Sequence, residues 1–143
     1  SKAELQRVPF FIRVPGMEGG VNHTYGGQID IIPTLLHLLG VETKDYVHFG
    51  TDLLSPEHIE VVPFRNGEFV SPTITYVADK FYDSETGLPL EEDRLEEAKG
   101  YQKFVQDRLE FSDRVVNGDL LRFYTPENFK PVDRSEYDYL KSE

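Results

Sequence analysis

The sequence predicts a mixed α/β fold of the α+β type, in which a strand and a packed helix precede an antiparallel sheet and a long helix. Three observations support this class. A near-continuous apolar run at residues 10–14, interrupted by Arg13, is followed by a glycine-rich connection and an apolar helix at residues 31–39. Two hairpin signals lie within residues 59–83, and a long amphipathic pattern covers residues 93–116. Strand and helix periodicities in this order indicate a mixed fold.

The apolar run at residues 10–14 has the pattern of a strand that is covered on both faces. Such a strand needs a neighbour on either side, so we expect the chain to be the C-terminal part of a larger α/β protein. Glycine pairs at residues 19–20 and 26–27 mark the loop that follows. An isolated strand at residues 8–14 has open edges, and the piece by itself is therefore expected to form a non-native dimer or to remodel its N-terminal segment.

The helix expected at residues 31–39 has both of its ends marked. Asp30 is the expected N-cap, and Pro33 falls in the first turn, where a missing N–H costs nothing. Gly40 stands where a left-handed C-cap is expected. Apolar residues wrap most of the helix circumference, so we expect the helix to pack between layers.

A meander of about four short antiparallel strands is expected next. Asn66-Gly67 between two apolar runs is a strong hairpin signal. Ala78-Asp79 is the expected turn between the last two strands. The four expected strands span residues 59–64, 68–70, 73–77 and 80–83.

A long amphipathic helix is expected at residues 93–116, because apolar residues recur there at spacings of three and four. Asn117-Gly118 marks its end. The short apolar segment at residues 120–124 is expected to pack back onto the core.

The composition is that of a globular, acidic chain. Of its 143 residues, 38% are hydrophobic and 13% are aromatic, which is enough for one core. Acidic residues number 26 against 15 basic ones, and the formal charge is −11. Because Lys and Arg form no stripe, we expect no binding to nucleic acid or to an anionic lipid surface.

The sequence contains no cysteine, which excludes disulfides, cysteine-ligated metals and thiol nucleophiles. This absence fits a cytosolic protein and an exported Gram-positive protein equally well. No run approaches the roughly 18 apolar residues needed to span a membrane, and no signal-peptide pattern is present. A membrane anchor upstream of this sequence is compatible with both observations.

His23 and Thr24 lie together in the glycine-flanked loop and are the first candidates for binding. A histidine beside a hydroxyl can contact a phosphate or a metal ion. One histidine without a second histidine or nearby carboxylates is a weak metal signal. The pattern therefore fits a surface loop first, a substrate contact second and a metal ligand last.

Asp30 and the other histidines have structural explanations. Asp30 could be a buried catalytic carboxylate, but its place before a proline-containing helix favours a cap. His37 lies within the apolar helix and is expected to make a hydrogen bond in or near the core. His48 and His58 stand in separate loops without ligand spacing, so both are expected at the surface.

Arg65 at the expected hairpin tip is the second candidate substrate contact. An arginine there could bind an anion, and a hairpin tip explains it equally well. Asp52, Glu57 and Glu60 form no recognisable acid–base pair. No Ser/His/Asp order, phosphate loop or zinc signature is present, so the residues alone indicate no complete active site.

Residues 26–40, GGQIDIIPTLLHLLG, resemble the Asp-x-x-Pro-Thr helix of the sulfatase-like branch of the alkaline phosphatase superfamily. Four further segments are similar to the C-terminal end of the lipoteichoic acid synthases in that branch. The similarity reaches from about residue 8 to residue 139. The four segments are residues 49–55, 61–67, 112–113 and 116–124.

The resemblance implies the C-terminal part of an alkaline-phosphatase-like fold. Residues 1–44 would supply one core strand and a packing helix to the end of the large sulfatase-like domain. Residues 45–143 would form a small subdomain with a roughly four-stranded antiparallel sheet and a long C-terminal helix.

The resemblance also implies an activity for the parent protein. Members of the family are Gram-positive membrane enzymes with an extracellular catalytic domain. They transfer glycerol phosphate from phosphatidylglycerol to a growing polyglycerolphosphate chain, through a threonine nucleophile and a divalent metal, commonly manganese. In the family these groups lie upstream of the segments matched here. No catalytic or metal-binding residue therefore carries over, and we expect this chain to be inactive alone and to hold no cofactor.

Two other hypotheses stay open. Arg65 and the aromatic meander could form a module that binds glycan or polyglycerolphosphate. Alternatively, the parent protein could be a true sulfatase or phosphatase, which would act on sulfate or phosphate monoesters.

Overall fold

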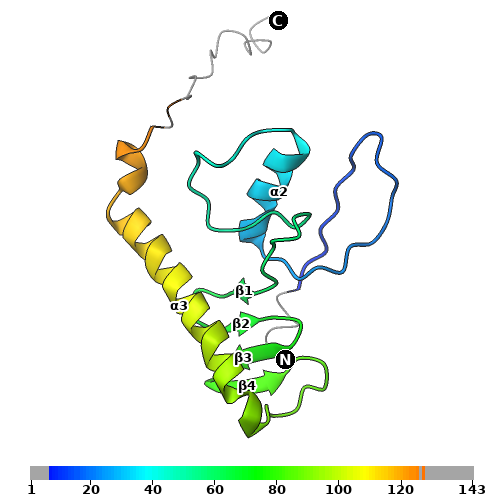
Figure 1. The fold of residues 1–143 in the computed structure, drawn as a ribbon, viewed down its shortest axis with the longest axis vertical. Coiled ribbons are helices and arrows are strands. Elements are labelled where there is room, and N and C mark those ends of the chain that lie inside the picture. Colours follow the sequence, from blue (N-terminus) through cyan, green and yellow to red (C-terminus); the bar gives the residue numbers. More distant parts are fainter. Residues whose placement is uncertain (1–6, 126, 128–143) are drawn as a thin grey trace, which may run out of the picture.

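The computed structural model describes residues 7–125 and residue 127. A short helical segment comes first, followed by a four-stranded sheet and a long helix, as Figure 1 shows. The antiparallel sheet and the long helix expected from the sequence are thereby confirmed. The helical elements are the 3-10 turn η1 (Gln28–Asp30), α2 (Ile31–Leu38), the 3-10 turn η2 (Glu92–Arg94), α3 (Leu95–Asn117) and the 3-10 turn η3 (Leu120–Phe123). The strands are β1 (Val62–Pro63), β2 (Phe69–Val70), β3 (Ile74–Val77) and β4 (Lys80–Asp83).

The sheet is an antiparallel meander in the order β1-β2-β3-β4. In its first hairpin, Phe64 N–H donates to Glu68 O and Gly67 N–H donates to Phe64 O. Gly67 has a φ of 86°, so the connection is a type I turn followed by a glycine bulge. The hairpin expected from Asn66-Gly67 is confirmed.

The two edge strands of the sheet differ in length. β1 pairs with β2 through only two residues, Val62 opposite Val70 and Pro63 opposite Phe69. β4 pairs with β3 along its whole length and begins at the exposed Lys80. Proline cannot donate a ladder hydrogen bond, which suits the edge position of β1.

The hairpin between β3 and β4 turns through Ala78 and Asp79, as expected. Both residues have positive φ, 51° and 59° respectively. Positive φ at two successive turn residues is the geometry of a type I′ turn, which matches the twist of the strands. Glycine adopts this geometry more easily than alanine does, because it has no Cβ.

Replacing Ala78 by glycine is expected to raise the free energy of unfolding by about 0.5–1 kcal/mol, because the Cβ penalty at positive φ is removed. Urea unfolding followed by circular dichroism measures the change. Gly67→Ala is the matched opposite variant, since Gly67 also has positive φ and a Cβ added there would meet no atom within 4 Å. We expect it to lower the stability by a similar amount, and a less stable Ala78→Gly variant would contradict the turn assignment.

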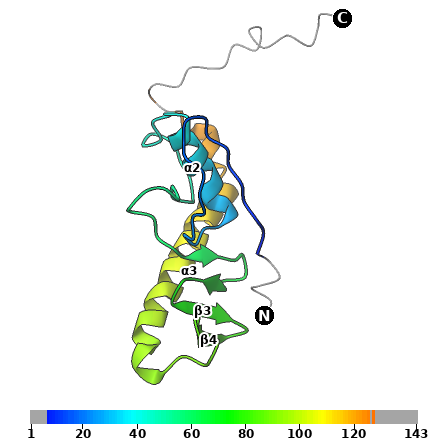
Figure 2. The same cartoon turned by 90° about the vertical axis from the view of Figure 1, so that its right-hand side faces the viewer.

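The core lies between the sheet and α3, which covers one face of the sheet (Figure 2). Phe69 and Ile74 from the strands are fully buried, as are Ala98 and Val105 from α3. Ala98 and Val105 are seven residues apart and therefore lie on one face of the helix. The partly buried residues around them are Tyr76, Phe81, Leu90, Tyr101, Phe104 and Leu109.

α2 forms close to the expected position, and Gly40 follows it with a φ of 70°. Only Pro33 and Thr34 of this helix are buried. Ile32 is 63% exposed, and Leu39, next to the helix end, is 75% exposed. The expectation that α2 packs between layers is not met within the described residues, because the sheet in this chain lies beside α3 instead.

Residues 10–14 do not form a strand, so that part of the sequence prediction is wrong for this chain by itself. Phe10, Phe11 and Ile12 are exposed, Phe11 at 87%. A strand exists only where a partner accepts its backbone hydrogen bonds, and no described segment pairs with this one.

The segment after α3 also differs from expectation. Residues 120–124 were expected to pack onto the core, but η3 is exposed along its length. The Tyr124 hydroxyl, directly after η3, donates to Asp45 O. The turn into η3 is made by Asp119, which has a φ of 49°.

Asp83 ties the end of β4 to the start of α3. One carboxylate oxygen accepts from the backbone N–H and the hydroxyl of Thr86 at 2.8 and 2.9 Å. The other oxygen lies 2.9 Å from Arg94 Nη1. The hydrogen bonds from Thr86 hold the pKa of Asp83 below its ordinary value, with smaller contributions from Glu85 N–H and the Arg94 charge.

This lowered pKa predicts an acid-sensitive contribution to stability. A carboxylate whose pKa is lower in the folded state stabilises the fold fully above its ordinary pKa of 3.8, and the contribution is lost as the pH falls through the folded value. Asp83→Asn is therefore expected to destabilise the chain more at about pH 6 than at about pH 3. Urea midpoints at the two pH values test this, and an equal loss at both would contradict it.

Candidate functional site

Asp30 is a buried carboxylate at the start of α2, with 4% of its surface exposed. One oxygen accepts from Gly27 N–H at 2.8 Å and the other from Thr51 N–H at 2.7 Å. No ion pair to Asp30 occurs among residues 7–125 and 127, so these backbone groups and the N-terminal end of α2 balance its charge. Asp30 was expected to cap α2. Its carboxylate caps η1 instead, and it also anchors the distant residue Thr51.

Thr34 supplies a second tie between α2 and the loop that carries Thr51. Its hydroxyl donates to Asp30 O at 2.6 Å and accepts from Leu53 N–H at 3.0 Å. The loop is therefore attached to the first turn of α2 by the backbone N–H groups of two residues, Thr51 and Leu53. Both polar groups of the Asp-x-x-Pro-Thr motif are used for this attachment.

Two glycines allow the backbones to approach at this point. A Cβ on Gly50 would lie 2.1 Å from Ile29 O, and a Cβ on Gly26 would lie 2.3 Å from a Leu53 methyl carbon. Neither glycine has positive φ, so it is the close contact that requires glycine here. We call the contact of Gly26, Asp30 and Thr34 with residues 50–53 the loop junction.

Tyr25 is held by side chains at both of its backbone polar groups. Its N–H donates to Glu60 Oε2 at 2.8 Å, and its carbonyl oxygen lies 2.8 Å from His58 Nε2. A carbonyl only accepts, so His58 Nε2 carries the hydrogen, and Nδ1 accepts from the Thr51 hydroxyl at 2.6 Å when the ring is neutral. His58 was expected to be an ordinary surface residue. Instead it joins two loops. We call Tyr25, His58 and Glu60 the Tyr25 clamp.

No contact joins the two predicted substrate-binding residues. His23 is exposed in the loop before η1, two residues ahead of Tyr25. Arg65 is at the hairpin tip, as expected, and its guanidinium lies 2.5 Å from Asp113 of α3. The arginine is therefore occupied by an ion pair on the α3 side of the molecule.

His37 and His48 are both exposed. For His48 this confirms the prediction. For His37 it corrects the prediction of a bond in or near the core, because His37 Nδ1 lies 2.5 Å from Asp52 Oδ2. The pair gives α2 another contact with the segment that contains the loop junction.

The resemblance described above implies a divalent metal ion, and the described residues do not fit one. Among residues 7–125 and 127, no three His, Asp or Glu side chains gather closely enough to hold a metal ion. We assign no metal chemistry to them. No helix in the same ranges is long and apolar enough to cross a membrane.

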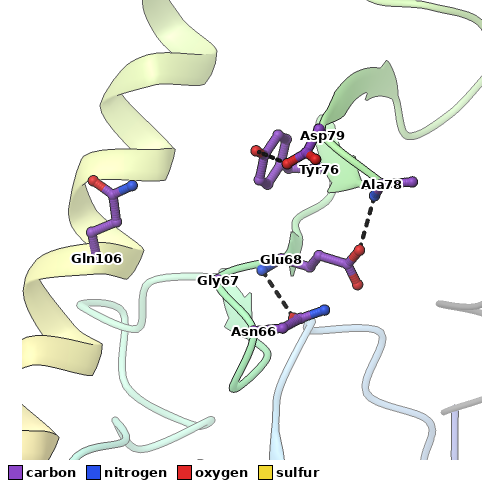
Figure 3. Close-up of a pocket in the computed structure, with 7 residues that line it drawn as sticks. All are labelled: Asn66, Gly67, Glu68, Tyr76, Ala78, Asp79 and Gln106. Carbon is purple, nitrogen blue, oxygen red and sulfur yellow. Dashed lines mark hydrogen bonds between the residues drawn. The ribbon is translucent and has the colours of Figure 1, made fainter.

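A cavity of about 290 Å³ opens between the hairpin turns and α3, as Figure 3 shows. Its polar groups hold the two turns: Ala78 N–H donates to Glu68 Oε1 at 2.8 Å, and the Tyr76 hydroxyl donates to Asp79 Oδ1 at 3.1 Å. Burial raises the pKa of Tyr76, and the bond to Asp79 raises it further. The fold explains these contacts without a ligand. The lining residues are Asn66, Gly67, Glu68, Tyr76, Ala78, Asp79 and Gln106.

Comparison with known proteins identifies relatives along nearly the whole chain, although no family model matches. Lipoteichoic acid synthases 1 and 2 of Bacillus subtilis are each 52% identical over 139 residues, or 97% of this chain. The lipoteichoic acid synthase of Staphylococcus aureus is 46% identical over 136 residues, or 95% of the chain. The chain is homologous to the C-terminal portion of the lipoteichoic acid synthases. It spans about a fifth of the length of these relatives (21%).

Sequence reasoning missed the two side chains that hold Tyr25 in this synthase homologue. Glu60 is 35 residues from Tyr25 and His58 is 33 residues away, so no local spacing reveals the contacts. Asp30 and Thr34 both belong to the motif by which the sequence resembles the synthases, and Asp30 was considered there as a cap and as a catalytic carboxylate. The motif alone did not show that these residues bind a second loop.

Proposed function

We propose that this chain is the C-terminal part of a lipoteichoic acid synthase-type phosphoglycerol transferase on the outer face of a Gram-positive cell membrane. The observation that carries the proposal is the 52% identity to two Bacillus synthases over 97% of the chain. In the intact enzyme, glycerol phosphate would pass from phosphatidylglycerol to a polyglycerolphosphate chain, and diacylglycerol would leave. The phosphoester bond to diacylglycerol breaks, and a new one forms to the acceptor hydroxyl.

The proposal assigns the chemistry to residues outside this chain. The threonine nucleophile and a divalent metal, with manganese as the expected ion, would belong to the upstream part of the enzyme. Residues 1–44 would complete the large catalytic domain, and residues 45–143 would form the small subdomain. Support comes from the exposed apolar residues of α2, which such a domain would cover.

A comparison of the intact protein with the isolated chain tests the proposal. Both are incubated with labelled phosphatidylglycerol and manganese, and diacylglycerol release is measured. We expect release by the intact protein and none by the isolated chain. Release by the isolated chain would place the active site within it. An intact protein that cleaves only sulfate or phosphate monoesters would favour the sulfatase or phosphatase alternative.

The exposed face of α2 also predicts how the isolated chain associates. Without the rest of the enzyme, Ile32, Leu35 and Leu39 are open to water, and copies are expected to pair through them. Sedimentation should then give a mass above the 16.5 kDa of the monomer, and Ile32→Glu should restore the monomer. Leu88→Glu is the control, since Leu88 is as exposed as Ile32 but follows β4 and is not part of α2. A monomeric wild-type chain would contradict the prediction.

A further inference from the structure

The Tyr25 clamp fixes one point of an otherwise open loop. A Cβ added at Gly19 or Gly20 would meet no atom within 4 Å, so the middle of this loop is open among the described residues. At Tyr25 the situation changes, because side chains bind both its N–H and its carbonyl oxygen. Both side chains come from the segment that leads directly into β1. The clamp therefore connects the end of the loop, by hydrogen bonds, to the segment that precedes β1.

The clamp on Tyr25 limits how far His23 can lie from it. Consecutive Cα atoms are about 3.8 Å apart, so the Cα of His23 stays within about 7.6 Å of the Tyr25 Cα. The intervening backbone is restrained as well, since Thr24 N–H donates to Asn22 Oδ1 at 2.8 Å. The exposed imidazole thus projects from a short segment that is attached to the Tyr25 clamp at one end and contains a local hydrogen bond.

The chemistry of His23 suits an anionic substrate. Between residues 14 and 36 it is the only side chain that can carry a positive charge, in a chain with a formal charge of −11. An imidazole can donate a hydrogen bond to a phosphate oxygen, and it does so more strongly when protonated. The Glu60 carboxylate, which is the acidic group of the clamp, accepts from Tyr25 N–H.

We propose that Glu60 and His58 are positioning residues, which hold Tyr25 so that His23 contacts the phosphate of the glycerophospholipid substrate. This inference rests on the function proposed above. It adds to that function a substrate contact and the two residues that place it. Because this phosphate is the group that is transferred, loss of the contact raises KM and also lowers kcat.

The test uses the intact enzyme and measures kcat and KM for phosphatidylglycerol. We expect His23→Ala to raise KM about tenfold and to lower kcat as well, so that kcat/KM falls more than about tenfold. Glu60→Ala is expected to raise KM severalfold, whereas Glu60→Gln keeps an acceptor oxygen for Tyr25 N–H and restores KM. Glu57→Ala is the matched control, because the exposed Glu57 side chain makes no hydrogen bond or ion pair within the described part of the chain.

The double variant His23→Ala/Glu60→Ala distinguishes positioning from a structural role. If Glu60 acts through His23, the double variant has the KM of His23→Ala alone, whereas independent effects multiply. His58→Ala provides a second route to the same test if Glu60→Ala does not fold. Multiplying effects, or a wild-type KM for either alanine variant, would overturn the positioning inference alone. An intact wild-type protein without any turnover of phosphatidylglycerol would instead overturn the proposed function.

Discussion

Gly50→Ala is expected to lower the free energy of unfolding by about 3 kcal/mol, at the upper end of the cost of overpacking. The new Cβ would lie 2.1 Å from Ile29 O, 2.3 Å from Ile29 C and 2.7 Å from Asp30 N. These are backbone atoms, and they cannot turn aside as a flexible side chain can. The neighbouring Thr51 N–H is also bound to the buried Asp30, so the loop cannot shift without breaking that bond.

Urea unfolding followed by circular dichroism measures this effect in the purified chain. Gly19→Ala is the control, because a Cβ at Gly19 meets nothing within 4 Å. Its stability is expected to stay within about 0.5 kcal/mol of the wild type. Equal unfolding midpoints for the two variants would contradict the close contact at the loop junction.

Phe69→Ala is expected to cost about 3–5 kcal/mol, which is the usual loss for a buried phenylalanine. Phe69 is fully buried in β2 between the sheet and α3. Its ring lies 5.8 Å from the ring of Tyr76 in β3 and 6.1 Å from that of Tyr101 in α3. Removing the ring would therefore leave a hole in the core and remove contacts to both the sheet and α3. Since small domains are stable by about 5–15 kcal/mol in total, the variant should lose a large share of the stability of the chain.

Phe123→Ala is the control, because it makes the same Phe-to-Ala change at a position that is 79% exposed. Its urea midpoint should match that of the wild type. A near-wild-type midpoint for Phe69→Ala as well would mean that the sheet and α3 do not share the core described above.

The sheet and α3 could be predicted because their signals are local. Asn66-Gly67 marks a turn within a few residues, and the seven-residue spacing of Ala98 and Val105 marks one face of a helix. The apolar pattern at residues 10–14 is equally local. It indicates what the segment prefers to contact, but it cannot supply the partner strand. That prediction therefore failed for the chain by itself.

The candidate site could be predicted only in part, because its contacts are long-range. His23 and Arg65 were chosen for their chemistry, and the structure ties Arg65 to Asp113, 48 positions away. The partners of Tyr25 come from a loop 33 to 35 positions away. Hydrogen bonds between irregular segments have no periodicity, so a sequence pattern cannot reveal them.

The short edge strand β1 has a consequence for the behaviour of this chain at high concentration. Edge strands with free N–H groups can recruit further strands and seed fibrous aggregates. β1 offers only two residues, one of which is Pro63, and β4 on the opposite edge begins with a charged lysine. Both features oppose strand addition. Copies of the chain should therefore meet through helices, and their assemblies should stay small and dissolve on dilution.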